Sequence, residues 1–260
     1  MKPTPRLEAR VRSAYEDPAQ VSAFSAIANE GLTPFEAVLV RRFVPGQRIL
    51  DVGCGGGREA VPMAQAGFRL VAMDVSLAMV RAATAYASER GASMPVIAAS
   101  LAALPFRGGA FDGIALLGQV IAHVAGRDGR VGALREAWRA LRPGGTLVMT
   151  THNRRCHWKF SLFFGWVNRW RRILRWLGHG SDLGDYDRWS ARIIKARGSR
   201  PVFFHMYDLD EAVADLREAG FDVLAGRGRA EFESGREEGG LRRRDYLLGF
   251  VARRPMDAQP

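Results

Sequence analysis

Short apolar stretches alternate with helical patterns along the first 150 residues, and each apolar stretch predicts a buried strand. These strands are expected at residues 48–52, 69–74, 95–99, 110–117 and 146–150. Apolar positions recur at helical spacing between them, at residues 58–66, 77–90 and 130–141. Continuous apolar strands joined by helices form a parallel sheet that is covered on both faces. The pattern therefore predicts a doubly wound α/β fold that binds ligands at the carboxyl ends of its strands.

The flanking regions extend this plan. Two helices are expected in residues 7–43, the second starting at Thr33-Pro34-Phe35-Glu36. Near the end of the chain we expect a helix at 209–219, strands at 221–224 and 245–251, and an exposed hairpin loop at 232–244. The expected organisation is an N-terminal helical cap (1–43), a core (44–151), a basic aromatic helical insertion (152–204), a C-terminal helix with the last two core strands (205–254) and a tail (255–260).

The first strand ends in an acid and is followed at once by a turn rich in glycine. Gly53, Gly55 and Gly57 can adopt positive φ and carry no Cβ, so a ligand can lie directly on this backbone. The spacing does not fit the dinucleotide fingerprint, because Arg58 occupies the position where close helix packing needs a small residue. A strand, a glycine turn and a helix N-terminus predict a site for a nucleotide-like ligand with an anionic group. The alternative is a tight turn without a ligand.

A second acid, Asp74, ends the next expected strand about twenty residues beyond the glycines, where a carboxylate can accept both ribose hydroxyls of an adenosine. The alternative is a helix N-cap, because Asp74 and Ser76 both precede an expected helix. Tyr15 could close over the polar end of the ligand, although an exposed helical tyrosine is the more frequent explanation.

Four motifs together resemble the class I methyltransferases that use S-adenosyl-L-methionine, and in particular their type 11/25-like domains. The motifs are Ile49-Leu50-Asp51-Val52-Gly53-Cys54-Gly55, Asp74 at a strand end, Leu104-Pro105-Phe106 before Phe111-Asp112, and Leu141-Arg142-Pro143-Gly144-Gly145. The resemblance covers about residues 32–151 and returns at 203–253. It implies a Rossmann-like seven-stranded sheet whose last strand is antiparallel, with S-adenosyl-L-methionine as the cofactor.

The resemblance also implies roles for single residues. The glycine turn should contact the methionine part of the cofactor, with Asp51 near its ammonium group and Asp74 on the ribose. Ser100 stands where the family often has an acid for the adenine amino group, so we expect weaker adenine discrimination. Gln119 should contact the methionine end, with an ordinary loop amide as an equal alternative. The expected cofactor contacts are Tyr15, Asp51, Gly53, Cys54, Gly55, Gly57, Asp74, Val75, Ser100, Leu101 and Gln119.

Methyl transfer requires little beyond alignment of a nucleophile and exclusion of water, and a base only when the acceptor is protonated and poorly acidic. His152 and His205 are expected at the edge of the pocket and are candidate bases. His123 matches a histidine common in the family after the fourth strand, with a packed histidine as the alternative. No spacing of acids, histidines or of Cys54 and Cys156 suggests a metal site, and both cysteines are expected to be free thiols.

The net charge of +11 is concentrated in the insertion, since twelve basic residues oppose three acidic ones between positions 152 and 200. Residues 158–177 form a strongly apolar helical pattern with arginines on another side. We favour a lid packed on the sheet edge; a substrate channel, shallow membrane contact and an RNA surface are the alternatives. Against RNA, the aromatic residues follow helical periodicity and are not scattered among the arginines.

No apolar run follows the charged start of the chain, and no stretch of ~20 uncharged apolar residues occurs, so a soluble cytoplasmic protein is expected. The predicted function is a S-adenosyl-L-methionine-dependent methyltransferase acting on an O, N or C nucleophile of a small, partly apolar molecule. A tRNA-modifying enzyme that uses the basic insertion and a non-catalytic cofactor-binding protein are the alternatives. The acceptor and the oligomeric state are left open.

Overall fold

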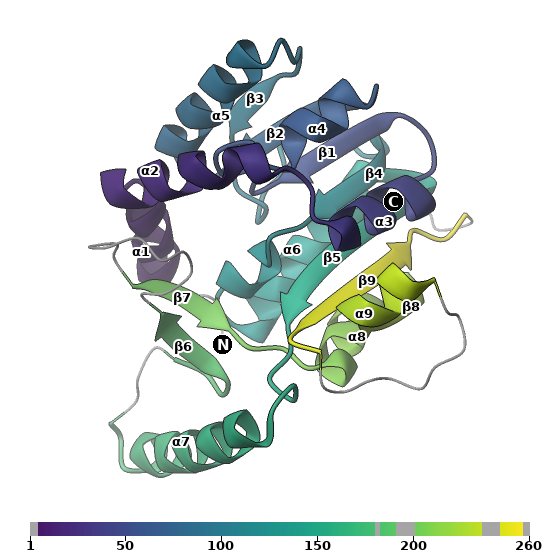
Figure 1. The fold of residues 1–260 in the computed structure, drawn as a ribbon. Helices are drawn as coiled ribbons and strands as arrows, with labels where there is room; N and C mark the ends of the chain where they lie inside the picture. The colour runs from purple at the N-terminus through teal and green to yellow at the C-terminus, as the bar shows by residue number, and fades with distance from the viewer. Residues whose placement is uncertain (1–4, 180–182, 191–200, 236–244, 257–260) are drawn as a thin grey trace.

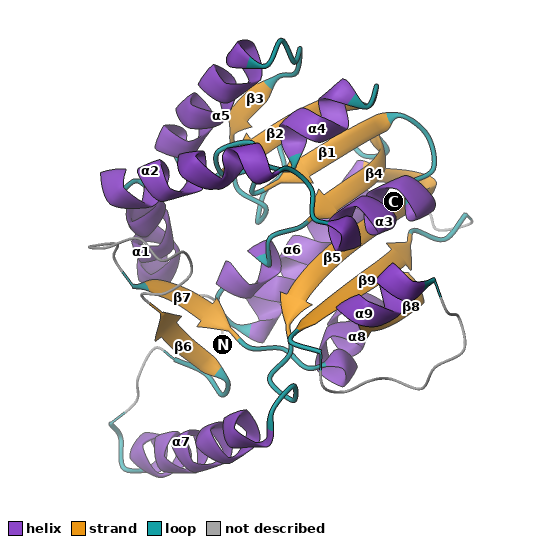
Figure 2. Ribbon diagram, viewed as in Figure 1, coloured by secondary structure: helices purple, strands orange, loops and turns teal. Residues whose placement is uncertain are grey.

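The computed structural model describes residues 5–179, 183–190, 201–235 and 245–256. Its centre is a seven-stranded sheet with helices on both faces (Figure 1, Figure 2). The strand order is β3-β2-β1-β4-β5-β9-β8. These strands are β1 (Arg48–Val52), β2 (Arg69–Asp74), β3 (Val96–Ala98), β4 (Phe111–Leu116), β5 (Leu141–His152), β8 (Asp222–Gly228) and β9 (Leu247–Arg253).

Strands β1 to β5 are parallel to one another, whereas β9 runs antiparallel to both β5 and β8. The doubly wound fold is therefore confirmed, including the antiparallel last strand that the family resemblance implies. The chain order reverses between β1 and β4, and a parallel sheet opens a crevice at the carboxyl ends of its strands at such a point.

Two apolar clusters cover the two faces of this sheet. One face packs against α6 (Arg127–Ala140) and α8 (Leu209–Glu218). The other packs against α3 (Pro34–Phe43), α4 (Ala60–Gln65), α5 (Leu77–Glu89) and α9 (Arg229–Ser234). The parallel strands are apolar along their length because both of their faces are buried in this way.

The N-terminal region differs from the expected pair of helices. It contains three, namely α1 (Pro5–Tyr15), α2 (Pro18–Ile27) and α3, with a short 3-10 turn η1 (Ala28–Glu30) before the last. The extra break lies at Asp17, whose side chain accepts a hydrogen bond from Ala19 N and caps α2, while Pro18 fits only the first turn of a helix. The expected start of α3 is confirmed, since Thr33 and Glu36 form a reciprocal capping box.

Residues 232–244 are not simply the expected exposed hairpin loop. Their beginning belongs to α9, which buries Phe232 against the rings of Phe35 and Phe43. Residues 236–244 lie outside the described part of the chain. The apolar ring of Phe232 explains why the segment folds back onto the sheet.

The insertion differs most from expectation. Its helix α7 (Trp158–Trp176) lies apart from the seven-stranded sheet, at the bottom of Figure 1, so it is not a lid on the sheet edge. It packs on a second, two-stranded sheet of β6 (Asp187–Ser190) and β7 (Val202–His205), which pair antiparallel. No helix in the described residues is both long enough and apolar enough to cross a membrane.

Phe250 tests the packing of the sheet. It is fully buried on β9, so Phe250→Ala should lower the free energy of unfolding by about 3–5 kcal/mol through lost apolar burial and a residual cavity. Leu224→Ala on the neighbouring β8 is the control: this side chain is 47% exposed and its loss should cost less than about 1 kcal/mol. Urea unfolding curves measure both values, and equal losses would contradict the assigned core.

Candidate functional site

A cavity of about 560 Å³ opens at the carboxyl ends of β1, β2 and β4, where the strand order reverses. Its wall combines the glycine loop after β1, the end of β2, and side chains from α1, α2 and α3. A pocket of this size accommodates a small-molecule ligand. Of the expected cofactor residues, those that line it are Tyr15, Gly53, Cys54, Gly55, Asp74, Val75, Ser100, Leu101 and Gln119.

The glycine loop adopts a conformation that only glycine allows without strain. Gly53 and Gly55 have φ of +75° and +51°. The N–H groups of Gly53 and Cys54 both donate to Met73 O, at 2.7 and 3.0 Å, which holds the loop against the end of β2. A Cβ on Gly53 would lie 2.3 Å from Cγ2 of Val120. The bare backbone of the loop is therefore a steric requirement of this wall.

Asp74 joins the loop to the helices around the cavity. Its Oδ2 accepts a hydrogen bond from Gly55 N at 3.0 Å, and its Oδ1 accepts one from Ser76 N at 2.9 Å. Ser76, and not Asp74, is the N-cap of α5, and the Ser76 hydroxyl donates to Tyr15 O at 3.0 Å. A carboxylate has about four lone-pair sites, so both oxygens of Asp74 retain capacity for ligand hydroxyls. The predicted ribose role is compatible with this geometry.

Buried carboxylates outnumber cations next to the loop. Glu36 and Glu59 line the cavity, and both bind the guanidinium of Arg58, which also donates to Gly31 O at 2.7 Å. Burial raises the pKa of Glu59 to about 7, although the charge of Arg58 opposes this shift. Asp51 is also buried, and its pKa is raised well above the ordinary range by desolvation and by the charge of Glu59.

This cluster fits the ammonium end of an amino-acid ligand. Oδ2 of Asp51 has no hydrogen-bond partner among the described residues, although it is buried. Asp51 does not line the cavity itself, but it lies close enough to Glu59, which does, for the charge of Glu59 to act on it. A bound cation would offset the excess negative charge. Glu36, Arg58 and Glu59 were not identified as site residues from the sequence. Glu36 belongs to a helix cap and Arg58 follows the glycine turn, and nothing in the sequence indicates that their side chains meet.

Tyr15 and His123 form a neutral pair in the cavity wall. His123 Nδ1 lies 2.8 Å from Phe203 O, and since a carbonyl only accepts, this nitrogen carries the proton. The Tyr15 hydroxyl therefore donates to His123 Nε2, at 2.9 Å. Burial lowers the pKa of His123 to about 4, and burial together with the Asp74 charge raises that of Tyr15. His123 is the histidine of the three candidates that lines the cavity.

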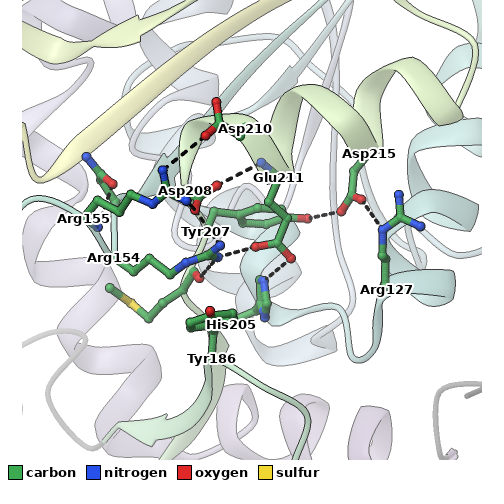
Figure 3. A network of polar contacts seen from close by, with 12 residues as sticks. Arg127, Arg154, Arg155, Tyr186, His205, Tyr207, Asp208, Asp210, Glu211 and Asp215 are labelled. Carbon is green, nitrogen blue, oxygen red and sulfur yellow. Dashed lines mark hydrogen bonds and ion pairs between the residues drawn. The ribbon is translucent and has the colours of Figure 1, made fainter. Parts of the chain in front are cut away.

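The other two candidate bases lie outside the cavity wall. His205 is 2% exposed, and its Nδ1 and Nε2 bind the carboxylates of Asp187 and Glu211 at 2.8 and 2.9 Å. Figure 3 shows His205 within a network of carboxylates and arginines at the start of α8. Because both ring nitrogens are engaged and His205 does not line the cavity, the structure gives no support to its predicted role as a catalytic base. His152 packs between Phe204 and Tyr246, and burial lowers its pKa to about 4.

Two further expected residues have roles in the local fold. Gly57 does not line the cavity; a Cβ there would lie 3.4–3.5 Å from Tyr86 and Ala83 of α5, so its place is in the packing behind the loop. The Ser100 hydroxyl accepts a hydrogen bond from Ala102 N at 3.2 Å, which shapes the turn after β3. Ser100 still faces the cavity and keeps a donor hydrogen for a ligand.

Comparison with known proteins agrees with this geometry. Residues 49–145 match the family model of the methyltransferase domain. A segment of 125 residues is 38% identical to the ubiquinone biosynthesis O-methyltransferase of Caulobacter sp. (strain K31) and covers 48% of this chain and 44% of that protein. The enzyme of the same name from Azorhizobium caulinodans is 29% identical over 239 residues, which cover 81% and 83% of the two chains. The chain spans about half the length of the first such relatives.

The solved structures extend the likeness to the whole fold. A S-adenosylmethionine-dependent methyltransferase from Methanosarcina mazei superimposes with a TM-score of 0.64 at 19% identity, covering 87% of this chain and all of that one. At this identity the likeness concerns the fold alone. The resemblance to class I methyltransferases that the four motifs suggested is confirmed by the matching domain model and by the sheet, and the matching domain supports S-adenosyl-L-methionine as the cofactor.

Gly53→Ala should weaken binding of S-adenosylhomocysteine at least about tenfold, because the added Cβ meets Val120 and forces the loop away from the cavity. Gly67→Ala is the matched control: its φ of +94° imposes the same backbone strain, but no atom lies within 4 Å of the added Cβ. Calorimetric titration of both folded variants measures the difference. Equal affinities would exclude the steric role of Gly53.

Glu59 should make ligand affinity depend on pH. Its pKa of about 7 in the folded protein is above the ordinary 4.5, so the free protein takes up a proton there and loses stability as pH rises from about 4.5 to 7. The ammonium group of a bound ligand favours the Glu59 carboxylate and expels this proton, so the affinity for S-adenosylhomocysteine should rise about eightfold from pH 6 to 7.5.

The control for this pH dependence is Glu59→Gln, which removes the titrating group and should give a flat profile. Calorimetry in two buffers of different ionisation enthalpy measures the proton release directly. A profile that rises equally in wild type and variant would assign the dependence to another group.

Proposed function

We propose that this protein, whose residues 49–145 form a class I methyltransferase domain, transfers a methyl group from S-adenosyl-L-methionine to a hydroxyl of a small, partly apolar molecule. The observation that carries the proposal is the glycine loop with its buried, cation-deficient carboxylates on one wall of the cavity. The relatives named ubiquinone biosynthesis O-methyltransferases support oxygen as the accepting atom and an intermediate of quinone synthesis as the acceptor.

The cofactor would be held by groups of three kinds. The loop backbone at Gly53 and Gly55 offers a surface free of side chains, and the Asp74 carboxylate accepts from hydroxyl groups. The carboxylates of Glu36 and Glu59 complement an ammonium group. When bound, S-adenosyl-L-methionine supplies an electrophilic methyl group on a sulfonium.

The rest of the cavity indicates the acceptor. Its wall includes apolar side chains from three helices and from β9, namely Val11, Phe24, Ile27, Phe35 and Leu247. Such a wall favours an acceptor with an apolar body, because burial of that body excludes water from the reacting atoms.

The Tyr15–His123 pair indicates how acidic the acceptor hydroxyl must be. His123 is a weak base with a pKa of about 4, and the lone pair of its Nε2 already accepts a hydrogen bond from the Tyr15 hydroxyl. A site with so weak a proton acceptor suits a hydroxyl that ionises readily, such as a phenol near pKa 10, and not an aliphatic alcohol near 16. We therefore propose a phenolic acceptor.

The basic insertion gives less support to a tRNA substrate. Arg171 donates to the carbonyls of Gly184 and Asp187 at 2.8 and 2.9 Å. Arg172 and Arg175 both pair with Asp185, at 2.7 and 2.9 Å. These three arginines are engaged within the insertion, so binding to phosphates would first require breaking those contacts.

Radiolabelled methyl transfer tests the proposal. Catechol-type phenols with an apolar side chain should accept methyl groups at least about tenfold faster than the corresponding benzylic alcohols, because the wall offers only a weak proton acceptor. Unmodified tRNA should accept none. Turnover on tRNA would favour the tRNA-modifying alternative, and calorimetric binding of S-adenosylhomocysteine without turnover on any acceptor would favour a non-catalytic protein.

A further inference from the structure

Helix α7 turns its apolar face toward solvent. Trp176 is 84% exposed and Trp166 is 70% exposed, in a chain whose other large apolar side chains are mostly buried. The helix lies at the periphery of the molecule in Figure 1, with the described elements on one side of it only. We call this surface the tryptophan face; it consists of Trp158, Leu162, Phe163, Trp166, Trp170, Ile173, Trp176 and Leu177.

The opposite side of α7 fixes this orientation. Phe164 is buried against Phe204 and Tyr186, and the Asn168 side chain accepts a hydrogen bond from Tyr186 N at 3.2 Å. The ion pairs of Arg172 and Arg175 with Asp185 add to this attachment. Rolling the tryptophan face inward would break all of these contacts, so the exposed face is a property of the fold.

The insertion is also tied to the core at its base. Arg154 binds the carboxylates of Asp208 and Glu211 at the start of α8, and its guanidinium stacks on Tyr186 at 3.8 Å (Figure 3). Side chains from the segment after β5, from β6 and β7, and from α8 thus meet in one buried network, with His205 at its centre. Charge-assisted hydrogen bonds of this kind hold a segment rigidly.

The charges on the tryptophan face are all positive. By helical periodicity, Lys159 lies beside Leu162 and Phe163, and Arg169 lies beside Trp166 and Ile173. Residues 158–176 contain no Asp or Glu. An apolar helical face with tryptophans and flanking cations is typical of helices that lie in a membrane interface, where the rings enter the acyl boundary and the cations reach anionic headgroups.

We infer that the tryptophan face docks on an anionic lipid surface, with α7 lying in the plane of the interface. The helix does not cross the bilayer, since no described helix is long and apolar enough to do so. A second copy of the chain fits less well, because pairing two such faces would bury Lys159 and Arg169 of both copies without an acidic partner.

Helix α7 is connected to the cavity by packing on the side opposite the tryptophan face. Phe164 of α7 contacts Phe204, and the Phe204 ring lies 5.0 Å from the ring of His123 in the cavity wall. An apolar acceptor dissolved in the membrane would therefore arrive close to the site. This consequence rests on the proposed function, whereas the docking itself does not.

Co-flotation of the full chain with vesicles tests the inference. The protein should float with vesicles of phosphatidylcholine containing about one third phosphatidylglycerol, and at least about tenfold less with phosphatidylcholine alone. Its tryptophan emission should shift to shorter wavelength on binding. Trp166→Glu with Trp170→Glu should reduce flotation at least about tenfold, and Lys159→Glu with Arg169→Glu should remove the preference for the anionic lipid.

The matched control is Leu224→Glu, which places the same charge on an exposed apolar residue of β8 and should leave flotation unchanged. Circular dichroism checks that each variant is folded. Absence of flotation by the folded wild type would overturn the inference, as would equal flotation of the Trp166→Glu, Trp170→Glu variant.

A stable dimer in light scattering that this double variant dissociates, together with no flotation of the wild type, would assign the face to a second copy. Methyl transfer to a short-chain water-soluble phenol should be unaffected by the same variant. Failure of docking is thus distinguishable from failure of the proposed function.

Discussion

The candidate site depends on the hydrogen bonds that the buried carboxylate of Asp74 accepts. One oxygen fixes the glycine loop through Gly55 N, and the other fixes Ser76, which caps α5 and donates to the backbone of α1 at Tyr15. Three segments that are far apart in the chain are held by one side chain and its neighbour. A carboxylate can do this and still accept from a ligand, because each of its oxygens has two lone pairs.

The cavity and the insertion differ in electrostatic character. Around the cavity, burial and neighbouring carboxylates raise the pKa values of Asp51 and Glu59, and a bound cation would offset their negative charge. On the insertion, exposed cations accompany an apolar helix without acids. Strand β7 lies between the two, since Phe203 O accepts from His123 and Phe204 packs on α7. A displacement of β7 would therefore alter contacts both at the cavity wall and with α7.

The insertion illustrates a limit of pattern analysis. The periodicity of residues 158–177 correctly predicts a helix and which side chains share a face. The expectation of a lid packed on the sheet edge was wrong, because Phe164 and the arginine contacts, and not the tryptophans, meet the rest of the protein. His205 is a similar case: its position before a helix suggested a base at the edge of the pocket. The unforeseen β6–β7 pairing places Asp187 against one of its ring nitrogens, and α8 places Glu211 against the other.

The sequence by itself determined the alternation of strands and helices in the core, the glycine loop and the acid at the end of β2, because these follow from residues that are neighbours in the chain. Only the tertiary structure decided which side chains that are distant in the sequence meet in the fold. Tyr15 and His123 are 108 positions apart, and Arg58 and Glu36 are 22 apart. The direction in which α7 faces was decided in the same way. Local pattern fixes the backbone geometry of an element, whereas its partners depend on packing between elements that no local pattern encodes.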